Sequence, residues 1–333
     1  MKPLFKYVIL FLGIIFAILI VYFFVGYTKP ASQMKWGVSF SLKHTKFLEI
    51  DARETFSALL DDLKVKHFRL ILHWDLIEPE KGQYDFKEFD WQMNEIEKRN
   101  GTAILAIGMK TPHWPECHLP QWAVSMKKEE QQEAILSMIE NVVSRYKDSK
   151  VLDSWQVENE IFLNFGACPW RDEKFLAKEI ELVRRLDSKH QIIITDSGEL
   201  SFWIKTAKYG DILGITTYKR VWQEQIRQYV SYIFPPVFYH RKAELLKMHT
   251  GKEVIGVELQ AEPWCANSIM NTAVWEQKET MDYKQFGENV KFAKDTGFDT
   301  FYFWGAEWWY YMLTKHNDPE IWNEAIKVFK ESI

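Results

Sequence analysis

The stretch Trp155–Glu160, which reads WQVENE, ends an apolar run that begins at Val151. The run has the residue types of a buried strand, and it stops abruptly at Asn159-Glu160. An amide and a carboxylate are therefore expected together at the carboxyl end of this strand. Later in the chain, the run Glu253–Trp264 (EVIGVELQAEPW) places Glu258 in the same way.

On both sides of WQVENE, apolar runs typical of strands alternate with segments of helical spacing. The expected strands cover residues 34–41, 67–76, 102–109, 151–160, 191–195, 212–218, 254–259 and 300–304. The expected helices cover residues 50–63, 86–99, 129–146, 172–188, 201–209, 241–249, 283–296 and 319–329. No Asn-Gly hairpin signal separates the strands, so the alternation favours a parallel sheet. Eight such units over about 300 residues predict an α/β fold, a (β/α)8 TIM barrel.

In such a barrel the chemistry lies at the carboxyl ends of the strands. Polar and aromatic residues interrupt the apolar runs where the predicted strands end. They are His73-Trp74, His113-Trp114, Asn159-Glu160, Tyr218, Glu258, and Trp304 with Glu307-Trp308-Trp309. These residues are the candidates for a functional site at the barrel mouth.

The segment Tyr7–Tyr27 is almost entirely apolar. At about 1.5 Å per residue it is long enough to cross a bilayer core of about 30 Å. Lys2 and Lys6 precede it, which predicts a cytoplasmic N-terminus and a catalytic part outside. The expected organisation is a tail at 1–6, a transmembrane anchor at 7–27, a linker at 28–33 and a catalytic domain at 34–333. A cleaved signal peptide, which would give a secreted protein, is the alternative, although the residues after Thr28 are a poor cleavage site.

Composition narrows the function classes further. The net charge is −4 without long runs of either sign, which gives no support for nucleic-acid binding. The fifteen Trp residues suggest either a large core or a cleft lined with stacking surfaces. We expect no metal site and no cofactor, because neither C-x-x-C nor a His cluster occurs. Cys117, Cys168 and Cys265 leave two alternatives open, a Cys117–Cys168 bridge or three unpaired thiols.

Two carboxylates that face each other across a barrel mouth can cleave a glycosidic bond. One must be protonated to donate to the leaving oxygen, and the other must be ionised to attack the anomeric carbon. The strands that end in Glu160 and Glu258 are the fourth and seventh of the predicted eight, so their ends can face each other across a sugar ring. A short distance between the two carboxyl groups, about 5 Å, would indicate retention.

Asn159-Glu160 ending strand four and Glu258 ending strand seven resemble the pattern of glycoside hydrolase clan A. This clan contains the cellulase-like family 5 and its relatives in families 10, 39 and 42. The resemblance covers the chain from Trp36 to about Trp309, and the segment after strand two (WDLIEPEKGQYDF, 74–86) is also similar. It does not single out one family.

The resemblance implies a role for each matching residue. Glu160 would be the general acid/base and Glu258 the nucleophile, while Asn159 would bind the sugar 2-hydroxyl. Arg69 and Tyr218 would hold the nucleophile ionised and oriented. Trp304 would stack under the sugar. We also expect His113, Trp114 and Trp308 to contact substrate, each with packing as its alternative.

Several neighbouring residues have more than one reading. Glu158 is expected to support the site, for example as a partner of Arg69, rather than to catalyse. Glu262 is the alternative to Glu258, but it lies in the Pro-Trp loop rather than directly at the strand end. Glu307 and His73 are equally suited to contacting a sugar and to structural pairing.

The leading hypothesis is therefore a retaining β-glycoside hydrolase, anchored in a membrane, that acts as a monomer on external or envelope glycans. The alternatives are a non-catalytic glycan-binding barrel and a transglycosylase that uses the same residues. The sequence leaves the sugar, the linkage and endo or exo action open.

Overall fold

The computed structural model describes residues 3–332. Its centre is a closed barrel of parallel strands in the order β1-β10-β9-β6-β5-β4-β3-β2. The strands are β1 (Lys35–Phe40), β2 (His67–Ile71), β3 (Thr102–Ile107), β4 (Leu152–Val157), β5 (Gln191–Ser197), β6 (Ile212–Thr217), β9 (Glu253–Gln260) and β10 (Thr300–Trp304). The predicted (β/α)8 barrel is confirmed, and the strands that carry Glu160 and Glu258 are the fourth and the seventh along the chain.

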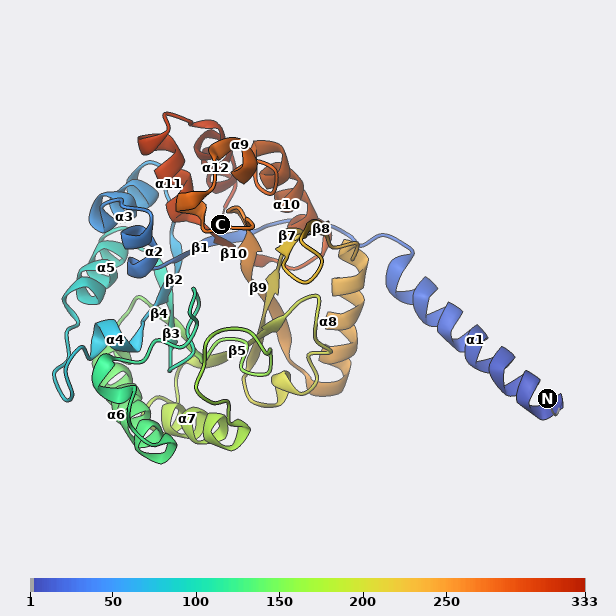
Figure 1. Cartoon of the computed structure of the whole chain (residues 1–333), viewed down its shortest axis with the longest axis horizontal. Coiled ribbons are helices and arrows are strands. Elements are labelled where there is room, and N and C mark those ends of the chain that lie inside the picture. The colour runs from blue at the N-terminus through green and yellow to red at the C-terminus, as the bar shows by residue number, and fades with distance from the viewer. Residues whose placement is uncertain (1–2, 333) are drawn as a thin grey trace.

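Helices surround this barrel (Figure 1). The longer ones are α3 (Ala52–Asp61), α5 (Lys87–Lys98), α6 (Lys128–Tyr146), α7 (Glu173–Leu186), α8 (Pro236–Thr250), α10 (Tyr283–Asp295), α11 (Ala306–Lys315) and α12 (Glu320–Lys330). Shorter turns are α2 (Leu42–Phe47), α4 (Trp74–Ile77), α9 (Val274–Gln277), η1 (Gln121–Ala123), η2 (Thr206–Lys208) and η3 (Ile269–Asn271). Asp172 caps α7, because its side chain accepts hydrogen bonds from the Lys174 and Phe175 amides.

Three predicted segments differ from the structure. Strand β2 ends at Ile71 rather than at 76, because the chain turns into α4 after His73. The helix expected over 201–209 is only the 3-10 turn η2. Residues 306–315, for which no helix is predicted, form α11, so Glu307 and Trp308 lie on a helix.

The barrel interior is filled by side chains. Ile104, Ile193, Val257 and Tyr302 form a buried cluster separate from the larger core between strands and helices. A Cβ at Gly37 would lie 2.4 Å from the Tyr302 ring, so glycine is needed there for the ring to fit. The interior is thus a packed core that supports the strand ends from below.

The N-terminal helix α1 (Pro3–Phe24) projects away from the barrel (Figure 1). Its segment Tyr7–Phe24 has a mean hydropathy of 2.9 and none of it is buried in the structure. Length and composition fit a membrane span, and a signal sequence has the same properties. The predicted division at 6, 27 and 33 remains a prediction, and Lys2 lies outside the described residues.

Two features that the sequence left open take definite form. Cys117 and Cys168 form a disulfide that joins the loops after β3 and β4, while Cys265 is free. The segment 222–240 is rich in aromatic residues, and the sequence predicts no role for it. In and just before it, β7 (Arg220–Gln223) and β8 (Gln228–Ser231) pair as an antiparallel hairpin.

Candidate active site

Glu258 lies on β9, is 4% exposed, and both of its carboxylate oxygens accept a hydrogen bond. Arg69 Nη1 donates to Oε1 at 2.8 Å, and the Tyr218 hydroxyl donates to Oε2 at 2.7 Å. A guanidinium and a phenol on opposite oxygens fix the plane of this carboxylate and stabilise its charge.

Arg69 comes from the interior of β2 and is fully buried. A buried guanidinium is costly unless its donors and its charge are matched. Its Nε donates to Gln156 Oε1 at 2.7 Å, its Nη2 to Asn159 Oδ1 at 3.1 Å, and its Nη1 to Glu258. One side chain therefore fixes the positions of residues from β4 and from β9, and Asn159 and Glu258 are held in one network.

Glu160 has a different environment, although it is also buried at 8% exposure. Its Oε1 accepts one hydrogen bond, from the Thr216 hydroxyl at 2.9 Å. Burial, and then repulsion from the Glu258 charge, raise the pKa of Glu160 to about 8. At neutral pH this carboxyl is therefore largely protonated and can donate a proton.

Glu160 follows β4 and Glu258 lies on β9, and the strands β5 and β6 lie between these two in the barrel. Thr216, the residue that donates to Glu160, is the register partner of Glu258 on the adjacent strand β9. The charge of Glu258 raises the pKa of Glu160 because the two side chains lie close together. The structure thus brings together the two glutamates that the sequence singled out.

The chain after β4 has an unusual backbone. Glu158 has φ 59° and Glu160 has φ 41°, which is the left-handed region that side chains with a Cβ seldom adopt. The Glu160 amide donates to Thr195 Oγ1 at 2.8 Å, which fixes this turn against β5. Strained backbone of this kind is common at functional sites, where the surrounding contacts hold it.

Glu158 supports the site, but Arg69 is not among its hydrogen-bond partners. Its carboxylate accepts from the amides of Met109 at 2.7 Å and Lys110 at 2.9 Å. The left-handed turn points this side chain toward the loop after β3, so the suggested partnership with Arg69 is replaced by support of that loop. Glu179 on α7 packs against it, and burial raises the pKa of Glu179 well above its usual value.

Glu116 is a further buried carboxyl at the site, and it is not among the residues expected from the sequence. Asn159 Nδ2 donates to Glu116 Oε2 at 3.2 Å, and Lys110 Nζ lies 3.7 Å from the same oxygen. Burial raises the pKa of Glu116 to about 7. The Cys117–Cys168 disulfide holds the adjacent residue, and the only sequence signal was a carboxylate beside a cysteine in the Pro- and Trp-rich loop.

On another side of the mouth, aromatic and imidazole rings gather around Trp304, which is 7% exposed. The His113 ring lies 4.1 Å from the Trp304 ring and 4.5 Å from the His44 ring. His44 Nε2 is 2.7 Å from Glu262 Oε2. Glu262, the alternative to Glu258, is thus paired with a histidine and has neither Arg69 nor Tyr218 as a partner.

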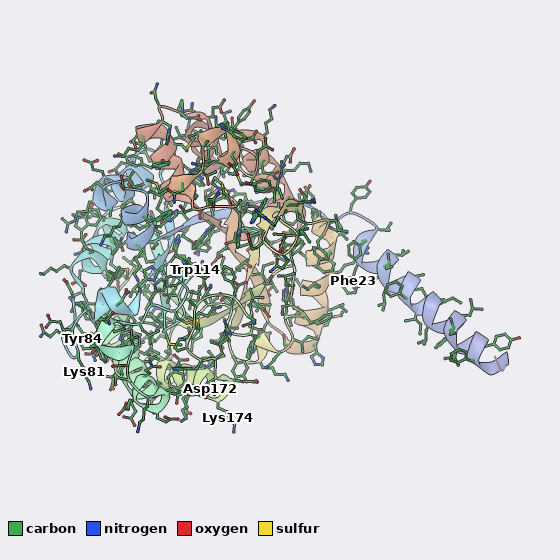
Figure 2. All side chains as sticks on the ribbon, in the orientation of Figure 1. Phe23, Lys81, Tyr84, Trp114, Asp172 and Lys174 are labelled. Carbon is green, nitrogen blue, oxygen red and sulfur yellow. A yellow bond between two sulfur atoms is a disulfide. The ribbon has the colours of Figure 1, made fainter. Side chains whose placement is uncertain are left out.

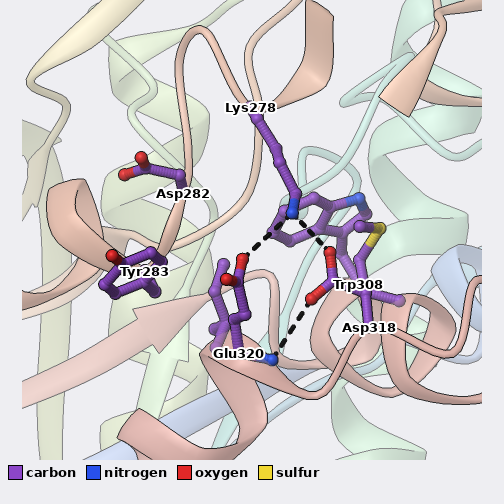
Figure 3. Close-up of a pocket in the computed structure, with 8 residues that line it drawn as sticks. Lys278, Asp282, Tyr283, Trp308, Asp318 and Glu320 are labelled. Carbon is purple, nitrogen blue, oxygen red and sulfur yellow. Dashed lines mark hydrogen bonds and ion pairs between the residues drawn. The ribbon is translucent and has the colours of Figure 1, made fainter. Parts of the chain in front are cut away.

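The remaining predicted residues lie in other surroundings. Trp114 is 69% exposed on the loop after β3 (labelled in Figure 2). Trp308 is fully buried, and its indole donates to Gln277 Oε1 at 2.8 Å. It lines a small pocket with Lys278 and Tyr283 (Figure 3), and because it is fully buried it offers no free ring face for a sugar. Glu307 and His73 both contact Ser41. The Ser41 amide donates to Glu307 Oε1 at 2.6 Å, and the Ser41 hydroxyl lies 3.0 Å from His73 Nε2.

Within residues 3–332, no group of three or more His, Cys, Asp or Glu side chains is arranged to hold a metal ion. The buried carboxyl groups of the site can carry out proton transfer and nucleophilic attack. One of these carboxyls carries a raised pKa, and the other has a cation and a phenol on its oxygens.

Comparisons with known proteins agree with this picture. The model of glycosyl hydrolase family 10 matches residues 46–196. The beta-galactosidase BgaA of Clostridium cellulovorans is 25% identical over 194 residues, which are 51% of this chain and 28% of that protein. The match therefore spans less than a third of this relative's length.

Solved structures share the fold at low identity. A GH5_18 from Bifidobacterium longum subsp. infantis has a TM-score of 0.58 and 12% identity, covering 90% of this chain and 79% of that one. An endo-beta-1,4-xylanase of family 10 from Gloeophyllum trabeum has a TM-score of 0.54 and 16% identity, covering 82% and 85%. The partial family match and the shared barrel fold agree with the predicted resemblance to clan A and with a glycosidase, and they do not assign one family.

Proposed function

We propose that this chain is a retaining β-glycoside hydrolase, with Glu160 as general acid/base and Glu258 as nucleophile. The observation that carries the proposal is the contrast between the two carboxyls. Glu258 accepts hydrogen bonds from Arg69 and Tyr218, whereas burial and a neighbouring negative charge raise the pKa of Glu160 to about 8. Double displacement needs one carboxylate that attacks and one carboxyl that donates a proton, and the contrast between these two environments fits both roles.

In the first step, a Glu258 oxygen forms a bond to the anomeric carbon. The bond from that carbon to the leaving oxygen breaks, and its electron pair stays on the oxygen. The Glu160 carboxyl transfers its proton to this oxygen, so the alcohol leaves neutral. Arg69 and Tyr218 aim the attacking carboxylate, and they remain hydrogen-bonded to it as its charge falls.

In the second step Glu160 acts as a base, because the charge on Glu258 has been lost. Once Glu258 is esterified it carries no negative charge, so its contribution to the raised pKa of Glu160 disappears. Glu160 is then a carboxylate that can take a proton from water while the water oxygen attacks the anomeric carbon. The bond to Glu258 breaks with its electron pair returning to the carboxylate.

The residues around this pair suit a sugar ring. Asn159 presents an amide between the two sides of the site, with its oxygen fixed by Arg69 and its nitrogen by Glu116. Trp304 and His113 supply ring surfaces, and Trp114 is exposed on the loop above. In this proposal Asn159 binds the 2-hydroxyl and the rings bind the apolar faces of the sugar.

The proposal places the barrel outside the cytoplasm, held by α1 in the membrane. The apolar helix supports an anchor, and the Cys117–Cys168 disulfide fits an oxidising compartment. The substrates would then be external or envelope glycans. Because the sequence relative is named a β-galactosidase, aryl β-galactosides belong among the first probes, along with aryl xylosides, glucosides and mannosides.

The test is a screen of aryl β-glycosides and polysaccharides with the full chain in detergent, with Glu258→Gln as the inactive control. We expect release of phenol or reducing sugar from at least one substrate class, and no release by the control. Oligosaccharide binding without any product would instead favour the non-catalytic barrel. Products extended by added sugar acceptors would favour the transglycosylase.

A further inference from the structure

Exposed apolar side chains lie on α8, on the segment just before it, and on the loop that Lys242 holds against it. They are Leu200 at 62%, Phe202 at 92%, Ile204 at 49%, Ile233 at 82%, Leu245 at 39% and Met248 at 74% exposed. We refer to these six residues as the α8 surface. Apolar side chains gathered in this way usually indicate a contact with another molecule or with a membrane.

The end of α1 packs against the start of α8. The Phe23 and Phe24 rings lie 5.8 Å and 5.5 Å from the Phe238 ring, and the Arg241 guanidinium lies 4.9 Å above the Tyr22 ring. Arg241 Nη1 also donates to the Val25 carbonyl at 3.0 Å. Figure 2 labels Phe23 at this junction, where α1 leaves the barrel.

The α8 surface continues this contact along one face of the helix. Phe238, Arg241, Leu245 and Met248 follow the three- and four-residue spacing that places side chains on the same side of a helix. The first two contact α1, and the last two are exposed. In Figure 1 both helices run in the same general direction away from their contact, so the later half of α8 lies on the side toward which α1 extends.

The loop before η2 is held beside this face. Lys242 Nζ donates to the carbonyls of Gly198 at 2.9 Å and Ser201 at 2.8 Å, and it lies 3.7 Å from the Trp203 ring. This lysine therefore fixes the loop against α8 while leaving the neighbouring Phe202 almost fully exposed. A fixed backbone with an exposed aromatic side chain suits insertion into a lipid interface.

We propose that the α8 surface lies in the interfacial region of the same bilayer that α1 spans, so that the barrel rests against the membrane. The exposed side chains of the contact are apolar. The nearby cations Lys247 and Lys205 are paired with Glu253 and Glu173, and Arg241 and Lys242 are hydrogen-bonded to backbone carbonyls. The contact should therefore form on zwitterionic lipid as well as on anionic lipid. This inference rests on the anchoring part of the proposed function and not on its chemistry.

The test uses the full chain with Cys265→Ala, the disulfide intact, and one nitroxide label at Met248→Cys, in phosphatidylcholine vesicles. Power saturation compares collisions with oxygen, which concentrates in lipid, and with a water-soluble nickel complex. The matched control is Trp275→Cys, another position that is 71% exposed but is on α9. We expect a ratio of oxygen to nickel collisions several-fold higher at 248 than at 275, and the same for Phe202→Cys.

A label at Ala17→Cys in α1 separates the possible failures. A lipid-exposed label at 17 together with nickel access at 248 equal to that at 275 would overturn the proposal and leave the anchor intact. A water-exposed label at 17 would overturn both the span and this contact, while the proposed hydrolysis would still stand. Labels at 248 shielded from both reagents, with dipolar coupling that grows with the protein-to-lipid ratio, would show that a second copy covers the surface and would also overturn it.

Discussion

Glu258 and Glu160 are the same residue type, are buried to a similar extent, and come from strands on either side of β5 and β6, yet their surroundings differ in charge and in donors. Glu258 accepts from a guanidinium and a phenol. Glu160 accepts from one threonine hydroxyl and lies near the negative charges of Glu258 and Glu116. The comparison teaches that the neighbours, and not burial alone, decide which carboxyl attacks and which one donates a proton.

The largest effect should come from removing the nucleophile. For Glu258→Ala we expect a loss of kcat of about 10⁵-fold or more, because no covalent intermediate can form. Added azide should restore part of the turnover, because it can occupy the space of the removed side chain and attack the anomeric carbon from there. Glu262→Gln is the control on the same segment. A larger loss of kcat in that variant than in Glu258→Ala would identify Glu262, and not Glu258, as the nucleophile.

Removing the acid should cost less and should depend on the leaving group. For Glu160→Ala we expect a loss of about 10²- to 10⁴-fold on substrates whose leaving alcohol needs protonation. On activated aryl glycosides the first step should be much less affected, since their phenols leave without a proton. Equal losses on both kinds of substrate would contradict the assignment of Glu160 as the acid.

The hydrogen bonds to Glu258 can be tested by removing the Tyr218 hydroxyl. Tyr218→Phe removes one donor to Glu258, and a hydrogen bond to a charged group contributes roughly 1.5–3 kcal/mol, so kcat/KM should fall about 10- to 100-fold. Tyr239→Phe is the control, because that hydroxyl is also buried but donates to Glu199. Comparable losses in the two variants would show a general structural effect.

The smallest change concerns the pH profile. Glu160 must be protonated to act as the acid, so kcat/KM should fall as the pH rises through about 8. The Glu116 charge contributes to that raised pKa, so Glu116→Gln should move the alkaline limb to lower pH. Glu276→Gln, a change at a carboxylate bonded to Tyr229, should leave the limb in place. An unmoved limb in Glu116→Gln would remove Glu116 from the electrostatics of the acid.

The barrel and its two glutamates were predictable because their signals are local. Each strand is a short apolar run, and Glu160 and Glu258 stand where two such runs end. Arg69 contacts the Glu258 carboxylate, the partner that the resemblance implied for it. The helix predicted after strand five is wrong, because its local pattern did not decide the structure. Only the turn Thr206–Lys208 forms there.

The rest of the site depends on loops that meet only in three dimensions. Glu116 reaches Asn159 from the loop after β3, and His44 reaches Glu262 across the mouth. No spacing in the sequence brings these pairs together. Trp308 shows the same limit, because α11 turns its ring into the core and its indole onto Gln277.

The most direct test of the contrast between Glu258 and Glu160 is covalent trapping. A 2-deoxy-2-fluoro aryl glycoside of a sugar that the enzyme turns over should form a glycosyl-enzyme that hydrolyses slowly, and peptide mass spectrometry can locate the ester. We predict one sugar on Glu258, and none on Glu160 or Glu262. A sugar on either of those glutamates, or turnover that gives the inverted anomer with no ester at all, would contradict the account.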